Sequence, residues 1–296
     1  MTNNKQQSFR AALVQMRSGR NIADNLVQAD QLIREAADKG AHYIQTPENT
    51  ALMELDPQIA MLEAQQFDTS SILAMFKALA RELKICLHIG SVAIKSAGKN
   101  RLLNRSCLIS PKGQIITHYD KIHLFDVDLP NGENYRESDN HQAGTRAVVT
   151  ELPVGLSPAP KLGLTICYDL RFPSFYRVLA KSGAQIIAVP AAFTKHTGEA
   201  HWHVLLRARA IETGCYILAA AQGGDHENGR STYGHSLIIS PWGEIIAEAG
   251  TEPQIIVADI DLANVAKARA QIPALTHDRP FEITEVTSCV ELEGMK

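Results

Sequence analysis

The stretch Ile109-Ser-Pro-Lys-Gly-Gln-Ile-Ile116 returns later in the chain as Ile239-Ser-Pro-Trp-Gly-Glu-Ile-Ile246. The two octapeptides agree at six of eight positions and lie 130 residues apart. In each, Ser-Pro-x-Gly separates apolar residues of high β propensity, which is typical of a tight hairpin turn between two strands. Because this turn is common, one such match can arise by chance. The recurrence of the octapeptide therefore predicts an internal repeat only if other segments match at a similar offset.

Two further matches occur in the same order along the chain. Residues 78–82 agree with residues 208–212 at three of five positions, again at an offset of 130. Residues 40–47 share Gly-Ala and a later proline with residues 183–190, at an offset of 143. The change of offset places a length difference in the loops that follow the two prolines. Three collinear matches predict two related halves, each built of helix, strand, helix, strand and hairpin.

The apolar pattern predicts alternating helices and strands. Helical spacing covers residues 23–39, where Gly40 is expected to end the helix, and residues 71–83. Apolar runs typical of strands occupy residues 11–16, 43–46, 86–94, 103–109 and 114–118. We therefore predict an α/β fold in which two mixed sheets from the pseudo-repeated halves pack face to face. With helices outside, this is a four-layer α-β-β-α sandwich.

No low-complexity linker divides the chain, so we expect residues 1–296 to form a single domain. Residues 152–161 hold three prolines and are expected to be a loop. Residues 124–145 are polar and rich in Asp, Asn and Glu. A loop of that length inside a compact domain is usually functional.

Composition excludes several classes of protein. The chain is 45% hydrophobic, enough for a large core, and its net charge of −3 offers no footprint for nucleic acid. No apolar stretch is long enough to span a bilayer, and residues 1–10 lack the apolar centre of a secretory signal. The five cysteines form no CxxC pair, which argues against a disulfide framework or a zinc knuckle. We expect a protein of the reducing cytoplasm, with no membrane partner.

Cys167 is the strongest candidate nucleophile. It ends an apolar strand over residues 162–166, and a helical pattern follows over residues 174–182. A thiol at a strand-to-helix turn is held out of the sheet and faces the amide groups of a helix start, which are expected to lower its pKa. The N–H of the next residue, Tyr168, can also point at an oxyanion. The alternative is a buried structural cysteine, the commoner fate of this residue.

Three charged residues are further candidates. Glu48 follows a predicted strand and a proline, a position suited to a general base. Lys121, among apolar and aromatic neighbours, can stabilise an oxyanion. Glu137 lies in the acidic loop. Taken singly, each is more often an ordinary solvated charge.

His201 and His203 suggest a metal-binding pair, but residues two apart on a helix point about 200° apart. No further ligands follow at a typical spacing, so we predict no metal site. The chain also has no nucleotide-binding glycine motif and no GxSxG elbow of a serine hydrolase.

Together these segments resemble the nitrilase superfamily of carbon–nitrogen hydrolases. The resemblance covers almost the whole chain and rests on Pro47-Glu-Asn49, Tyr119-Asp-Lys-Ile-His-Leu-Phe125 and Ile166-Cys-Tyr-Asp-Leu-Arg-Phe-Pro173, reinforced by segments 201–202, 207–212 and 234–236. It implies the same sandwich and a catalytic set of Glu48, Lys121 and Cys167, with Glu137 as a second active-site glutamate. It also implies a thioester acyl-enzyme, no metal or organic cofactor, and a homodimer or higher homo-oligomer.

Within this family, residues 190–202 are most similar to amidases that act on deaminated glutathione and release α-ketoglutarate and cysteinylglycine. A small anionic amide is therefore the expected substrate. The expected contacts come from Tyr168, Arg171, Phe193, Thr194 and Lys195, with Arg171 the first choice for binding the anion and Lys195 the second.

Three alternatives remain open. One is an omega-amidase acting on α-ketoglutaramate or α-ketosuccinamate, and another is an N-carbamoyl amidohydrolase or nitrilase on the same fold. The third is a catalytically idle scaffold, against which the intact Glu48, Lys121 and Cys167 count. His203 stands where many relatives place a glutamate.

Overall fold

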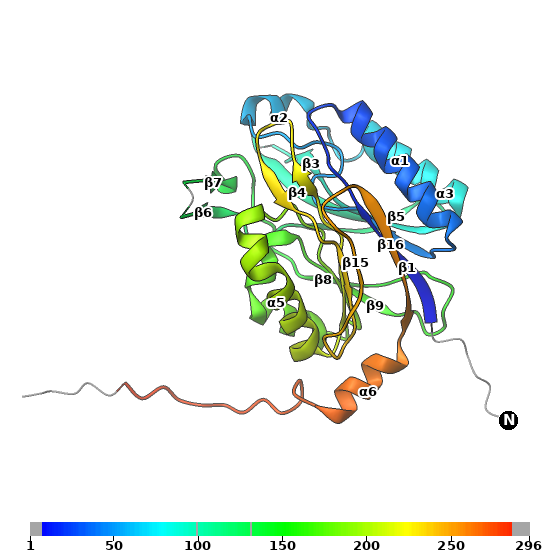
Figure 1. Cartoon of the computed structure of the whole chain (residues 1–296), viewed down its shortest axis with the longest axis vertical. Helices are drawn as coiled ribbons and strands as arrows, with labels where there is room; N and C mark the ends of the chain where they lie inside the picture. The colour runs from blue at the N-terminus through cyan, green and yellow to red at the C-terminus, as the bar shows by residue number, and fades with distance from the viewer. Residues whose placement is uncertain (1–7, 99, 131, 286–296) are drawn as a thin grey trace, which may run out of the picture.

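Two six-stranded sheets form the centre of the molecule (Figure 1), in a computed structural model that describes residues 8–98, 100–130 and 132–285. The first sheet has the order β16 (Gln254–Asp261), β1 (Ser8–Gln15), β2 (Tyr43–Gln45), β3 (Cys86–Lys95), β4 (Leu102–Ile109) and β5 (Ile115–Asp120). The second has the order β15 (Ile245–Glu248), β14 (Leu237–Ile239), β11 (Tyr216–Ala219), β10 (Ile186–Ala188), β9 (Lys161–Leu164) and β8 (Val148–Glu151).

The internal repeat is visible in the topology. Each sheet has three parallel strands, β1-β2-β3 or β9-β10-β11, followed by an antiparallel hairpin, β4-β5 or β14-β15. The two matching octapeptides are the turns of these hairpins, and each has a register shift just before its turn. Gly113 and Gly243 occupy the left-handed region with φ of 73° and 84°, a conformation that glycine adopts at no steric cost. The predicted pair of mixed sheets is confirmed.

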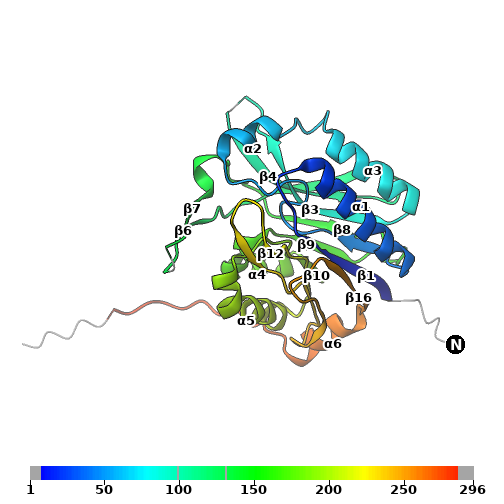
Figure 2. The same cartoon turned by 45° about the horizontal axis from the view of Figure 1, so that its top comes forward.

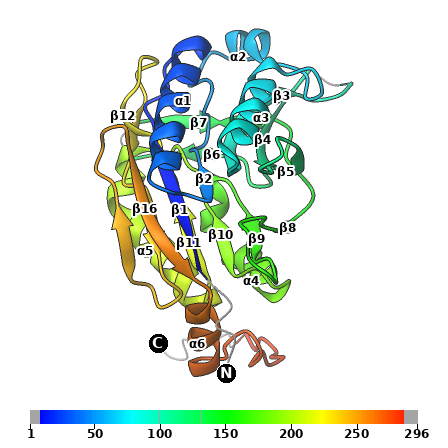
Figure 3. The ribbon, with the colours of Figure 1, turned by 90° about the vertical axis from the view of Figure 1, so that its right-hand side faces the viewer.

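The halves also exchange their edge strands. β8, which follows the first half, pairs antiparallel with β9 of the second sheet. β16, which follows the second half, pairs antiparallel with β1 of the first sheet (Figure 3). This reciprocal exchange interlocks the two halves, and the sequence repeat alone does not predict it.

Side chains of the sheets alternate between two apolar layers, as the period of two in a strand requires. In β1, Ala11 and Leu13 face the second sheet, whereas Ala12 and Val14 belong to the cluster under the helices. The outer helices are α1 (Ile22–Asp38) and α3 (Ser71–Leu83) on the first sheet, and α4 (Pro173–Lys181) and α5 (Lys195–Thr213) on the second (Figure 2). The four-layer arrangement is therefore confirmed.

The remaining elements lie at the ends of the sandwich. They are α2 (Pro57–Glu63), α6 (Ala263–Gln271), and the hairpins β6-β7 (Asp126–Asp128, Asn134–Arg136) and β12-β13 (Gly223–Asp225, Ser231–Tyr233). After α6 the chain first contacts α4, where Arg177 bonds to the carbonyl of Ala274 and Lys181 pairs with Asp278, and the described chain then leads away from the sandwich (Figure 1). Residues 124–145 are thus not a plain loop, because β6-β7 and a 3-10 turn at Glu137–Asp139 lie within them. Among the described residues, no helix combines the length and the apolar character that a membrane crossing needs.

Of the five cysteines, Cys289 lies outside the described residues. The other four, Cys86, Cys107, Cys167 and Cys215, are buried free thiols.

Candidate active site

Cys167 occupies a strained turn just after the carboxyl end of β9, a strand of the second sheet. β9 ends at Leu164, two residues earlier than predicted, because the N–H of Ile166 leaves the sheet and donates to Asp169 Oδ2 at 2.8 Å. Cys167 then begins a 3-10 helix, Cys167–Arg171, that precedes α4. Its φ of 48° lies in the left-handed region, which is rare for a residue with a side chain and concentrates at functional sites.

Asp169 fixes this turn from within the core. It is fully buried and its carboxylate accepts hydrogen bonds from the Tyr119 hydroxyl at 2.7 Å and from the backbone N–H of His123 at 3.1 Å. The His123 Nδ1 lies 2.7 Å from the same carboxylate. Tyr119 and His123 flank Lys121, so Asp169 joins the cysteine turn of one sheet to the lysine segment of the other.

Lys121 is buried between two carboxylates. Its Nζ lies 3.0 Å from Glu48 Oε1 and 2.8 Å from Glu137 Oε2. The Lys121 side chain is 2% exposed, so neither partner is a solvated surface charge. Glu48 Oε2 accepts a further hydrogen bond from the backbone N–H of Ala192 at 2.8 Å. The three charged residues selected from the sequence therefore meet at one point.

Asn104 completes the cluster, although nothing in its sequence context marks it. Its side-chain amide donates to Glu48 Oε1 at 2.9 Å and to Glu137 Oε1 at 3.0 Å. Its backbone carbonyl accepts from the N–H of Lys121 at 3.0 Å. One residue of β4 thus sets the spacing of both carboxylates and of the lysine.

The charges of the cluster hold each other ionised. Burial alone would raise the pKa of Glu48, but the charge and hydrogen bond of Lys121, with the more distant charge of Arg230, lower it to about 2. Burial opposes charge in Glu137 too, and Lys121 again lowers its pKa. Burial alone would lower the pKa of Lys121, but Glu137 and Glu48 raise it above the ordinary value.

The pKa of the Cys167 thiol differs from the value expected from the sequence. Burial raises the pKa of Cys167, and the charge of Glu48 and a hydrogen bond to it raise it further, against the opposing charges of Lys121 and Arg230. The predicted lowering by a helix start is wrong, because a short 3-10 turn replaces the helix start and an anionic carboxylate lies beside the sulfur. At neutral pH the resting thiol therefore keeps its proton next to a base.

A cavity of about 320 Å³ opens onto this cluster, a volume suited to a small molecule. Cys167, Glu48, Lys121 and Glu137 all line it. A larger cavity of about 630 Å³ beside α6 contains none of these four residues.

The five predicted substrate contacts do not line this cavity. Tyr168 is close to it, since its ring lies 5.2 Å from that of Phe125, a lining residue. Phe193 directly follows Ala192, whose N–H donates to Glu48. The Arg171 guanidinium lies 5.1 Å from the Phe193 ring centroid, and its Nη1 is 3.2 Å from His201 Nδ1. Two other predicted contacts lie at the start of α5: Thr194 pairs with Thr197, and Lys195 lines a separate cavity.

Arg230 lines the cavity, and the sequence reasoning missed it. Two other cations, Lys121 and Arg136, also line the cavity, but each is paired with a carboxylate, Glu137 or Asp128. The Arg230 guanidinium lies 5.2 Å from the Tyr135 ring centroid and donates through Nη2 to the carbonyl of Ala192. Its Nε is buried and has no hydrogen-bond partner among the described residues. An arginine between two turn-forming segments gives no sequence signal that separates it from a surface charge.

Comparisons with known proteins agree with this geometry. A family model described as carbon-nitrogen hydrolase matches residues 10–270. The chain is 40% identical over 271 residues to a deaminated glutathione amidase of Synechocystis, covering 91% of this chain and 97% of the relative. It is 38% identical over 272 residues to a deaminated glutathione amidase of Mus musculus, covering 91% and 83%.

Solved structures give the same result for the fold. The NitFhit protein of C. elegans superposes with a TM-score of 0.83 at 34% identity, covering 93% of this chain and 66% of that chain. Nit3 of Saccharomyces cerevisiae, described as a member of the nitrilase superfamily, superposes with a TM-score of 0.83 at 28% identity, covering 94% and 98%. The chain therefore belongs to the carbon-nitrogen hydrolase family and is an amide-hydrolysing enzyme.

Proposed function

We propose that Cys167 is the nucleophile, Glu48 the general base, and Lys121 the cation that stabilises the oxyanion. Glu137 orients Lys121. The observation that carries this assignment is the burial of Lys121 between two carboxylates beside a thiol, with all four side chains lining one cavity. Burying two carboxylates with a single ammonium group costs free energy, because all three charges lose their contact with water. A cluster that served only the stability of the fold would not need a thiol beside it.

The chemistry follows from the protonation states. Because burial and Glu48 raise the pKa of Cys167, Glu48 must remove the thiol proton as the sulfur attacks the amide carbon. Lys121 and the N–H of Tyr168 bind the developing oxyanion. The C–N bond then breaks, Glu48 delivers the proton to the leaving nitrogen, and a thioester remains on Cys167. Water, deprotonated by Glu48, attacks the thioester and releases the acid and the thiol.

We propose deaminated glutathione as the substrate, because the similar relatives at about 40% identity carry that name. This molecule has a carboxylate at each end, one on the acyl side of the scissile amide and one on the leaving group. Arg230, in the cavity with an unpartnered Nε, suits the acyl-side carboxylate. Arg171, beside the aromatic pair Tyr168 and Phe193, suits the carboxylate of the leaving group.

A panel of amides tests the substrate class. Deaminated glutathione, α-ketoglutaramate, glutamine and an N-carbamoyl amino acid are compared by release of amine or ammonia. We expect the highest kcat/KM for deaminated glutathione. A higher value for α-ketoglutaramate would make the enzyme an omega-amidase, and carbon dioxide release would make it a carbamoyl hydrolase.

Two matched variants test the arginines. Arg230→Met should raise KM at least about tenfold for both deaminated glutathione and α-ketoglutaramate, which share the acyl side, since a charged hydrogen bond contributes about 1.5–3 kcal/mol. Arg171→Met should raise KM for deaminated glutathione alone. Equal KM values in Arg230→Met and wild type would remove Arg230 from the binding site.

We also propose a homodimer and a cytoplasmic location, which follow from the family resemblance and from the unpaired cysteines. Sedimentation equilibrium of the full chain and fractionation of its host cells test the two.

A further inference from the structure

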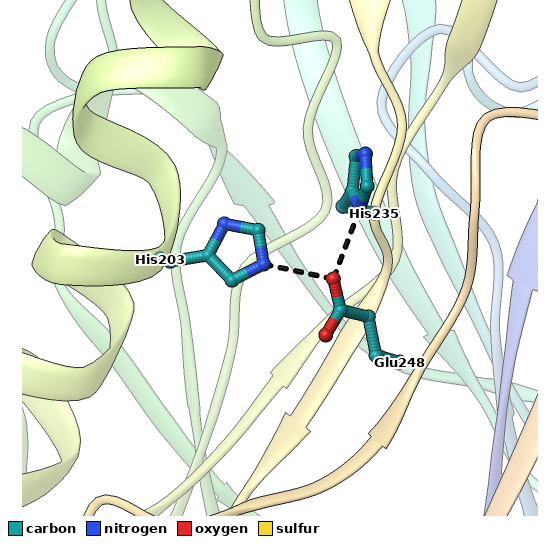
Figure 4. Close-up of side chains that lie close together, drawn as sticks. All are labelled: His203, His235 and Glu248. Atoms are coloured by element: carbon teal, nitrogen blue, oxygen red, sulfur yellow. Dashed lines mark hydrogen bonds and ion pairs between the residues drawn. The ribbon is translucent and has the colours of Figure 1, made fainter.

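Three side chains with metal-binding atoms lie close together (Figure 4). His203 Nε2 and His235 Nδ1 each lie 2.9 Å from the same oxygen, Oε1 of Glu248. The three residues come from α5, from the loop before β14 and from the end of β15. All three ligand atoms lie within 4.8 Å of one another. None of the three residues lines the cavity that holds Cys167.

The His235 ring is held in place by its surroundings. Its backbone has a φ of 50°, a left-handed conformation that is costly for a residue with a side chain. The backbone carbonyl accepts from Trp202 Nε1 at 2.8 Å, and the N–H donates to Gly250 at 2.9 Å. The ring stacks on Tyr233 with a centroid distance of 4.4 Å. Metal ligands need this kind of prior orientation.

We propose that His203, His235 and Glu248 bind one divalent transition-metal ion of the zinc class. Two imidazole nitrogens and one carboxylate oxygen are a common donor set for Zn²⁺, whereas Ca²⁺ and Mg²⁺ prefer oxygen alone. In a tetrahedral site with bonds of about 2.1 Å, the ligand atoms stand roughly 3.4 Å apart. The two 2.9 Å contacts with Glu248 would lengthen by about half an ångström, and the two histidine nitrogens, which lie within 4.8 Å of each other, would adjust to about 3.4 Å.

A fourth ligand is available from solvent. The side chains of His203, His235 and Glu248 are 29%, 26% and 38% exposed, so water can complete the shell.

The pairing could not be deduced from sequence spacing. His201, the expected partner of His203 on the same helix, instead contacts Arg171 at 3.2 Å. The second histidine comes from a segment more than thirty residues later, brought next to α5 by the second sheet.

The ion would join two segments that border the active site. Trp202 of α5 packs on Phe193 at a ring distance of 5.1 Å, and the N–H of Tyr233 donates to the Phe193 carbonyl at 2.9 Å. His235 follows Arg230 by five residues. A metal bound to His203 and His235 would therefore fix α5 to the segment that carries Arg230. This inference does not depend on the proposed substrate.

Calorimetric titration with Zn²⁺ tests the site directly. The parent is the full chain with Cys167→Ala and Cys289→Ser, so that neither the cavity thiol nor the thiol outside the described residues competes for zinc. After chelator treatment at pH 7.5, we expect one ion per chain and a rise in Tm. Co²⁺ should give the visible absorption of a site with nitrogen and oxygen ligands.

Two ligand variants and one control decide the outcome. His203→Ala and Glu248→Gln should weaken zinc binding by at least about tenfold, since even partners outside the ligand shell are worth 10–100-fold. His201→Ala, two positions away on the same helix, should bind like the parent. Circular dichroism of each variant checks the fold. No binding by the parent, or equal affinity in His203→Ala and the parent, would overturn the proposal and leave the three residues as an ion-pair cluster.

Discussion

The substitutions Glu48→Gln and Glu137→Gln should lower kcat to very different degrees. Both carboxylates contact Lys121 and Asn104, and each accepts one backbone N–H, from Ala192 or from Phe125. Their surroundings are thus nearly matched. Of the two carboxylates, only Glu48 is among the groups that shift the pKa of the Cys167 thiol, so only Glu48 is expected to move a proton.

The expected loss for Glu137→Gln follows from its contacts. The amide oxygen can replace Oε2, which accepts from Lys121 at 2.8 Å and from the N–H of Phe125 at 2.7 Å. The amide nitrogen then faces the donor of Asn104, so that hydrogen bond is lost. Replacing a charged hydrogen bond by a neutral one costs about 1 kcal/mol, and losing a neutral one costs about another 1 kcal/mol. A total of roughly 2 kcal/mol corresponds to a fall in kcat of about 30-fold.

Glu48→Gln loses a similar set of contacts and, in addition, the general base, which contributes about 10²–10⁴ in rate. We therefore expect kcat to fall at least about 10³-fold, while urea unfolding shows about the same loss of stability in both variants. Steady-state kcat with saturating amide and equilibrium unfolding measure the two effects separately. Equal losses of kcat in the two variants would refute the division of roles between the glutamates.

Two further predictions concern pH and the cysteine turn. Because the folded pKa of Glu48, about 2, lies below its unfolded value, its charge stabilises the fold above the unfolded pKa, and that contribution is lost as pH falls toward 2. The free energy of unfolding should decrease more steeply below pH 5 in wild type than in Glu48→Gln, and parallel curves would contradict this. Asp169→Asn should lower the free energy of unfolding by about 2–4 kcal/mol, because hydrogen bonds to the buried carboxylate lose their charge. Asp169→Asn should also lower kcat by loosening the Cys167 turn. Urea unfolding measures the loss of stability, and steady-state kinetics measure kcat. A stability and a kcat both near the wild-type values would contradict this role of Asp169.

The repeat made the architecture predictable from sequence. The octapeptides at 109–116 and 239–246 mark equivalent hairpins, and the helix and strand patterns before them fix the order of elements. The exchange of β8 and β16 was not predictable in this way. Both are edge strands whose partners lie in the other half, and local hydrophobic pattern says little about which edge a strand joins.

The candidate site was only partly predictable. Glu48, Lys121 and Cys167 stand in recognisable segments, so their meeting could be expected from the family resemblance. Asn104 and Arg230 stand in no such segment, and only the folded chain brings them to the cavity.

The raised pKa of Cys167 also required the structure. The sequence predicts a thiol near a helix start, whereas burial and an adjacent carboxylate decide its protonation. Charges that meet through tertiary contacts cannot be weighed from neighbours along the chain.

The most direct test of the central claim is to trap the acyl-enzyme. Full-length enzyme is mixed with deaminated glutathione, quenched in acid within the first turnover, and analysed by intact mass and by peptide mapping. We expect a transient acyl adduct on the peptide containing Cys167, absent in Cys167→Ala, that decays as the acid product appears. Product formation with no adduct on Cys167, or with the adduct on another residue, would contradict the claim.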